Sequence, residues 1–105
     1  MQQENKLAQF LKEKRTQSGL SQKDVATKLG YSTSQFISNW ERGVSQPPIN
    51  TLRTLATMYK VSAEQMFNVL LEETMLQVQA DLKKKFYAAD ATIENKTKNS
   101  IENRA

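Results

Sequence analysis

The stretch LSQKDVATKLGYSTSQFISNWERG, residues 20–43, decides the fold of this chain. It predicts two short helices joined by a tight turn. Ser21 is expected to cap the first helix, with Asp24 three residues later as its capping-box partner, and Gly30 is expected to end that helix. The second helix is expected over about 34–42, after a turn rich in hydroxyl side chains. The rest of the chain is then scaffold for these two helices or an accessory to them.

Apolar and polar side chains separate onto opposite sides of both helices. Val25 and Leu29 are four residues apart, and Ile37 and Trp40 are three apart. Such spacings place each pair on one face of a helix, so we expect these four side chains in the core. Phe36 falls on the boundary, where partial burial is expected. The opposite arc of the second helix is polar and carries Gln35, Ser38, Asn39 and Arg42.

Three further helices are predicted around this pair. One covers residues 6–15, and another covers about 49–59 after the Pro47-Pro48 loop. Ser62 caps the third, with Gln65 as its capping-box partner, and this helix completes a domain that ends near residue 70. The apolar residues expected in the core from these helices are Leu7, Phe10, Leu11, Ile49, Leu52, Leu55, Ala56, Tyr59, Val61, Met66, Phe67 and Leu70.

A different pattern begins after this domain. Residues 71–89 are expected to form a C-terminal helix with a narrow apolar stripe at near-heptad spacing, made of Leu71, Met75, Val78, Leu82 and Phe86. Because the core is already complete, pairing with another copy is the natural way to bury this stripe, although it could instead fold back onto the domain. Glu72 and Glu73 are expected to be exposed on this helix. Residues 90–105 are polar and are expected to be frayed or disordered.

The predicted fold class is therefore all-α, with a five-helix domain over residues 1–70 and a C-terminal dimerisation helix over residues 71–89. The chain has 105 residues, which suits one small domain and one accessory element. It contains no cysteine and no histidine. That composition excludes disulfides, thiolate nucleophiles, zinc sites built on Cys or His, and the commonest general base. With no glycine-rich phosphate loop either, we expect no enzyme, no cofactor and no metal.

The positive charge of the chain is concentrated in the predicted domain. The net charge is +4, and residues 1–66 carry nine basic against five acidic side chains, whereas residues 67–105 carry six of each. A small basic domain suits a phosphate backbone. The N-terminal segment is polar, and no apolar run approaches the ~20 residues that a transmembrane helix needs. We therefore expect a cytoplasmic protein with no membrane and no small-molecule ligand.

Many of these positions resemble the lambda-repressor-like helix-turn-helix family, also called the XRE or Cro/cI type. The resemblance spans roughly residues 6–70, and the turn at 31–33 is one residue longer than in the commonest version. The residues that carry it are Leu20-Ser21-Gln22, Ala26, Leu29-Gly30, Ile37, Glu41-Arg42-Gly43, Thr51-Leu52, Leu55-Ala56 and Val61-Ser62.

The resemblance implies a five-helix domain that binds double-stranded DNA, usually as a homodimer on a near-palindromic operator, with the second helix of the motif in the major groove. It implies that Gln22 grips phosphate and supports the reading helix, and that Arg15 and Glu41 form an ion pair beside the DNA backbone. The base-facing residues that it implies are Thr33, Ser34, Gln35 and Asn39. Arg42 and the loop 44–46, including Ser45, match the segment that grips phosphate, and Ser38 shares the polar face.

The chemistry of these side chains agrees with such a role. Gln and Asn can make paired hydrogen bonds to adenine, whereas Lys and Arg on phosphate hold register without reading sequence. Phe36, if it tips outward, could touch a thymine methyl. Two alternatives stay open at this point. The polar face could be only solvated surface, and the chain could be a protein-interaction module, such as an antitoxin or adaptor, that uses its C-terminal helix.

Overall fold

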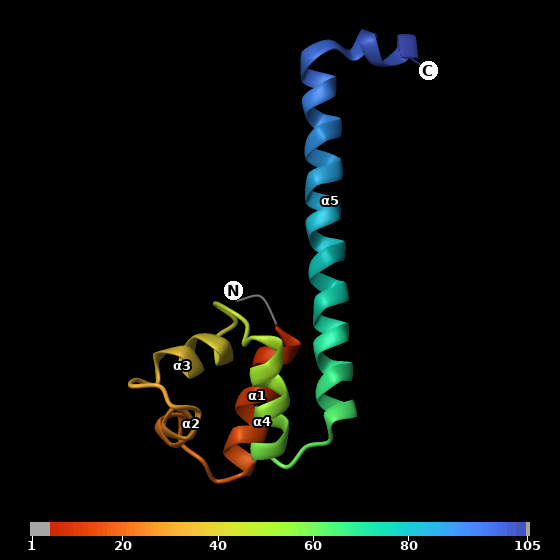
Figure 1. Cartoon of the computed structure of the whole chain (residues 1–105). Coiled ribbons are helices and arrows are strands. Elements are labelled where there is room, and N and C mark those ends of the chain that lie inside the picture. The colour runs from red at the N-terminus through yellow and green to blue at the C-terminus, as the bar shows by residue number, and fades with distance from the viewer. Residues whose placement is uncertain (1–4, 105) are drawn as a thin grey trace. The chain divides into compact units, whose positions relative to one another are not determined.

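The computed structural model describes residues 5–104, with side chains up to Ala88. Its helices are α1 (Lys6–Gln17), α2 (Gln22–Leu29), α3 (Gln35–Glu41), α4 (Ile49–Met58) and α5 (Ala63–Arg104) (Figure 1). No strand occurs among the described residues, and the predicted all-α fold is confirmed. The fifth helix of the domain and the C-terminal helix are not separate elements, because α5 continues through both without a break.

One compact unit ends at Glu73 and a second begins at Thr74. The first unit holds α1 to α4 and the start of α5 around a single core (Figure 1). Its most completely buried large side chains are Leu11, Val25, Ile37, Leu52 and Leu55. Trp40 is also in the core, as its position three residues after Ile37 predicts. This core fixes the inward faces of α2 and α3 and so determines which of their side chains face solvent.

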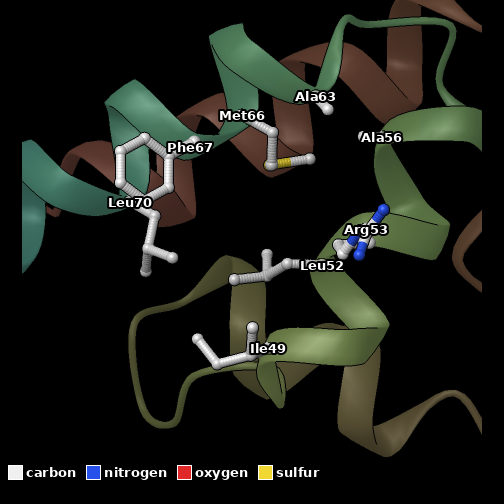
Figure 2. Close-up of a pocket in the computed structure, with 8 residues that line it drawn as sticks. All are labelled: Ile49, Leu52, Arg53, Ala56, Ala63, Met66, Phe67 and Leu70. Carbon is white, nitrogen blue, oxygen red and sulfur yellow. The ribbon is translucent and has the colours of Figure 1, made fainter.

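Two residues that the sequence pattern assigns to the core are instead exposed. Ile49 is 58% exposed and Phe67 is 56% exposed. Both line an open groove between α4 and the start of α5 (Figure 2). Ile49 occupies the first turn of α4, where it borders this groove, and Met66 takes the inward position next to Phe67. Helical spacing identifies an apolar face but does not show where that face leaves the core.

Short-range capping agrees with the sequence at the start of several helices. Ser21 and Asp24 form the predicted capping box of α2, and Gly30 ends that helix with a left-handed φ of 85°. The Ser62 hydroxyl accepts a hydrogen bond from the backbone N–H of Gln65 at 3.0 Å. Asn5 caps α1, because its side chain accepts from the Ala8 backbone N–H at 2.8 Å. Each of these bonds satisfies a helical N–H that has no partner within its own helix.

Glu73 is buried, contrary to its predicted exposure. Its side chain accepts a hydrogen bond from the backbone N–H of Lys6 at 2.8 Å, and only 5% of the residue is exposed. Lys6 begins α1, where a carboxylate compensates both the unpaired N–H and the positive end of the helix dipole. The neighbouring Glu72 stays exposed and binds the Lys6 ammonium at 3.0 Å. The start of α5 is therefore tied to the start of α1 by two adjacent carboxylates.

The apolar stripe on the C-terminal part of α5 is exposed. The exposed fractions are 44% for Leu71, 61% for Met75, 51% for Val78, 61% for Leu82 and 68% for Phe86. Such a series of large apolar side chains along one helix is typical of a surface that another protein covers. The prediction that residues 90–105 are frayed or disordered concerns a segment whose side chains lie outside the described residues, and it stays a prediction.

Candidate nucleic-acid interface

One hydroxyl side chain of the turn between α2 and α3 holds the start of α3. Ser34 stands at the N-cap position of α3 but makes no capping hydrogen bond with its side chain. The Thr33 hydroxyl instead accepts a hydrogen bond from the backbone N–H of Gln35 at 2.9 Å. Thr33 is therefore engaged in holding the start of α3, whereas the Ser34 hydroxyl makes no cap.

The two faces of α3 differ sharply in exposure. Ile37 is 1% exposed and Trp40 is 4% exposed, so both anchor α3 in the core. On the other face Gln35 and Arg42 are exposed, and Ser38 and Asn39 are half-buried. Because the inward face is fixed by two large buried side chains, the outward face is held in a defined orientation. The four polar residues predicted for this face all lie on it.

These four side chains are connected to one another by hydrogen bonds. The Gln35 side-chain amide donates to Asn39 Oδ1 at 3.2 Å. The Arg42 guanidinium donates to the same Asn39 oxygen and, through Nε, to the Ser38 hydroxyl at 3.3 Å. The i, i+4 and i, i+3 spacing on one helix makes these contacts possible. The outer face of α3 is therefore a linked row of amide, hydroxyl and guanidinium groups.

Phe36 lies beside this polar row and is 51% exposed. Its ring packs against Tyr31, with centroids 4.9 Å apart, and Tyr31 in turn lies edge-on to Trp40 at 6.1 Å. Phe36 is therefore more exposed than the partial burial predicted for it, because its ring packs on Tyr31 at the surface and not in the core. The exposed part of the ring offers an apolar contact next to groups that form hydrogen bonds.

A buried polar network fixes the end of α3 against α1 and α2. The Glu41 carboxylate accepts from Arg15 at 2.6 and 3.0 Å and from the Gln22 amide at 3.0 Å. Arg15 also donates to the Leu20 carbonyl at 2.8 Å. The hydrogen bond to Glu41 raises the pKa of Arg15 above its usual value. The side chains of Arg15 and Glu41 are only 12% and 3% exposed, so this is a nearly dry ion pair.

Gln22 has two possible roles in this network. Its side-chain nitrogen donates one hydrogen to Glu41, which supports α3 from α2. An amide nitrogen carries two hydrogens, so the second can be donated to a phosphate oxygen. The contact to Glu41 is thus compatible with both parts of the role that the resemblance implies for this residue.

The loop after α3 is held by its own backbone. The amides of Val44 and Ser45 donate to the Asn39 carbonyl at 2.9 and 3.4 Å. These two N–H groups are therefore engaged, whereas the side chains of Arg42 and Ser45 are exposed. Gly43 adopts a left-handed φ of 76°, and a Cβ there would lie 3.2 Å from Asn5 Nδ2. The sequence reasoning did not identify this close approach between the end of α3 and the cap of α1.

The geometry is that of two short helices with a polar, outward-facing second helix. Comparison with known protein families gives a match to the helix-turn-helix family over residues 11–66. The chain belongs to the XRE/lambda-repressor-like helix-turn-helix family. The match covers α2, α3 and α4 completely, with most of α1 and the first residues of α5. No curated protein matches the chain.

Membership of this family has direct consequences for function. The family consists of DNA-binding regulators that are typically not enzymes, and it implies binding to double-stranded DNA. Within the described residues, no three Asp, Glu, His or Cys side chains are grouped as a metal ion would require. None of the helices in the described part is both long and apolar enough to cross a bilayer.

Proposed function

We propose that this chain is a sequence-specific transcription regulator, a repressor that binds a near-palindromic operator as a homodimer. The observation that carries this proposal is the linked polar row on the outer face of α3, held in place by Ile37 and Trp40 on the inner face. A short helix anchored in this way can enter the major groove with its polar side chains directed at base edges. Such a regulator acts on DNA in the cytoplasm of a bacterium or on a phage genome.

The side chains in and around α3 divide into contacts to bases and contacts to phosphates. Gln35 and Asn39 carry amides, which can pair with adenine N6 and N7, and we assign them to bases. Thr33, Ser34 and Ser38 are less selective and add contacts at the edge of the same face. Arg42, Gln22 and Ser45 are assigned to phosphates, where they hold the register of the domain on the duplex. The Arg15–Glu41 pair makes no base contact and sets the position of α3.

Selection from a randomised duplex pool at near-physiological salt tests this function. A dimeric regulator enriches a two-fold symmetric motif, and the half-site spacing reports the separation of the two α3 helices. Enrichment of a single asymmetric half-site contradicts the homodimer. Binding without any enriched motif contradicts sequence reading and leaves only contacts to the backbone.

The exposed apolar stripe favours a second candidate function, a protein-interaction module such as an antitoxin or adaptor. Replacing Val78 and Leu82 by glutamate in the full chain distinguishes the two. The dimeric regulator loses self-association and most of its affinity for a two-fold site. An adaptor keeps its affinity for DNA and loses only its protein partner.

A further inference from the structure

The apolar stripe of α5 starts earlier than the sequence pattern indicates, and its spacing is symmetric. Phe67 stands four residues before Leu71 and is 56% exposed. From Phe67 to Phe86, successive stripe residues are separated by steps of four, four, three, four and four. This series is the same in both directions along the helix. Its centre is the peptide bond between Leu76 and Gln77.

We propose that α5 pairs antiparallel with α5 of a second copy, with the two-fold axis at this centre. The proposal rests on the homodimer of the proposed function and gives its pairing direction and register. A contact of this kind is isologous and closed, so it stops at two copies. It sets Phe67 opposite Phe86 of the second copy, Leu71 opposite Leu82, and Met75 opposite Val78.

Parallel pairing in register would also bury the stripe, so the charges decide the direction. Residues 63–76 carry three acidic and no basic side chains, and residues 77–88 carry three lysines and one aspartate. Of these acidic residues, Glu73 is buried against the start of α1 and Glu72 binds Lys6 at 3.0 Å, so the charge that a second copy meets comes mainly from the exposed lysines at 83–85. Parallel pairing in register sets the two lysine triplets at 83–85 side by side. Antiparallel pairing sets each triplet opposite residues 68–70 of the second copy, which carry no charge, and also opposes the helix dipoles.

The groove beside Phe67 extends the same apolar surface onto α4. Its volume is about 250 Å³, and apart from Arg53 its lining is apolar. Figure 2 shows Phe67 on the α5 side of the groove, with Leu52 and Ile49 on the α4 side. In the antiparallel pair, Phe86 of the second copy lies against Phe67 at the edge of this groove. The contact covers an aromatic side chain that the core leaves more than half exposed.

Single cysteines test the direction directly, because the chain has none of its own. The variants are Leu71→Cys and Leu82→Cys in the full chain, with Ala80→Cys, on the opposite side of α5, as the control. Antiparallel pairing separates the two copies of residue 71 by about 16 Å along the helix axis. A disulfide needs Cα atoms about 4.4–6.8 Å apart, so neither variant can link to itself. A mixture of the two variants does link on mild oxidation.

Each result decides one question. Cross-linking in the mixture but not in either variant alone supports antiparallel pairing. If Leu71→Cys and Leu82→Cys each link to themselves and Ala80→Cys does not, the helices pair in parallel and the proposal is wrong. A two-fold symmetric operator would in that case still support the dimeric regulator. A monomer of the unmodified chain in sedimentation overturns the pairing altogether. Operator selection by that monomer would still show that α3 reads DNA.

Charge reversal gives an independent measurement on a folded, full-length chain. Lys83→Glu with Lys85→Glu, which flank the stripe beside Leu82 and Phe86, places acidic groups near Glu64 and Glu72 of the second copy. We expect the dimer dissociation constant to rise by roughly tenfold or more at low salt, and the change to shrink as salt is added. Parallel pairing already sets these positions against their own copies, so an unchanged dissociation constant contradicts the antiparallel arrangement.

Discussion

Arg15 Nε and Glu41 Oε2 lie 2.6 Å apart and join the last turns of α1 and α3. The same carboxylate accepts from Gln22 on α2, so one acidic group receives donors from both of the preceding helices. Removing either charge leaves the other in a nearly dry site. Together with the buried Ile37 and Trp40, this contact sets the position of α3 and the direction of the polar row.

Arg15→Met or Glu41→Met is expected to lower the free energy of unfolding by about 3–5 kcal/mol, because the remaining charge stays buried without its partner. That is a large part of the stability of a small domain. Urea denaturation of the full chain followed by circular dichroism measures the loss. Lys12→Met, at an exposed position on α1, is the control and should change little.

The double variant Arg15→Met with Glu41→Met tests whether the loss of stability comes from the unpaired buried charge. Removing both charges also removes the unpaired partner, so the double variant is expected to lose less than the sum of the single losses. Strict additivity of the two losses would show that the ion pair does not determine the stability of this site.

Glu73→Ala is expected to destabilise the chain by about 1–3 kcal/mol, because the Lys6 backbone N–H then loses a buried acceptor. Glu73→Gln keeps an acceptor oxygen and should recover part of the loss. Glu72→Ala is the matched control on the neighbouring residue. It removes only an exposed ion pair, which is worth about 0–1 kcal/mol. Equal losses for Glu72→Ala and Glu73→Ala in thermal unfolding would rule out the proposed cap of α1.

Features that depend on residues close together in the chain could be predicted from the sequence. The capping box at Ser21 and Asp24, the end of α2 at Gly30 and the burial of Trp40 all follow from spacings of three to five residues. The hydrogen bond between Gln35 and Asn39 has the same local basis, and the i, i+4 spacing could have indicated it.

Contacts between residues far apart in the chain could not be predicted from the sequence in this way. The bond from Lys6 to Glu73 joins residues 67 positions apart, and no local pattern marks either as its partner. Phe67 shares the core-like spacing of its helix but lies on the groove, because the start of α5 covers only part of α4. The pairing of Arg15 with Glu41 was implied by family resemblance and not by spacing, and the contact is present in the structure.

The contribution of Asp24 to the free energy of unfolding is expected to depend on pH. Hydrogen bonds from the Ser21 backbone and side chain lower the pKa of Asp24 in the folded chain. A lowered folded-state pKa means that the stabilisation is complete above the unfolded-state pKa and is lost as the pH falls through the folded-state value. The difference in unfolding free energy between the wild type and Asp24→Asn should therefore be constant near neutral pH and shrink in acid. A difference that grows on acidification would contradict this assignment.

Arg42→Ala is expected to weaken binding to all duplexes alike and to reduce the slope of log affinity against log salt by about one unit, since one phosphate contact is lost. Fluorescence anisotropy over a salt series, on an operator and a scrambled duplex, measures both effects. Arg42→Lys keeps the charge and should retain most of the slope. A loss confined to the operator would instead place Arg42 on a base, or show that its hydrogen bond to Asn39 orients that base contact.

Gln35→Ala and Asn39→Ala should each lose discrimination at one or two base pairs, by about 1–3 kcal/mol per contact. Because the Gln35 amide donates to Asn39 at 3.2 Å, each variant also loosens the other side chain. The two losses are therefore expected to be less than additive in the double variant, as measured by competition binding against single-base operator variants. Gln9→Ala, an exposed glutamine on α1, is the control for amide loss away from α3. Unchanged base preference in both variants, with α3 still folded, would exclude this face as the reader of the operator.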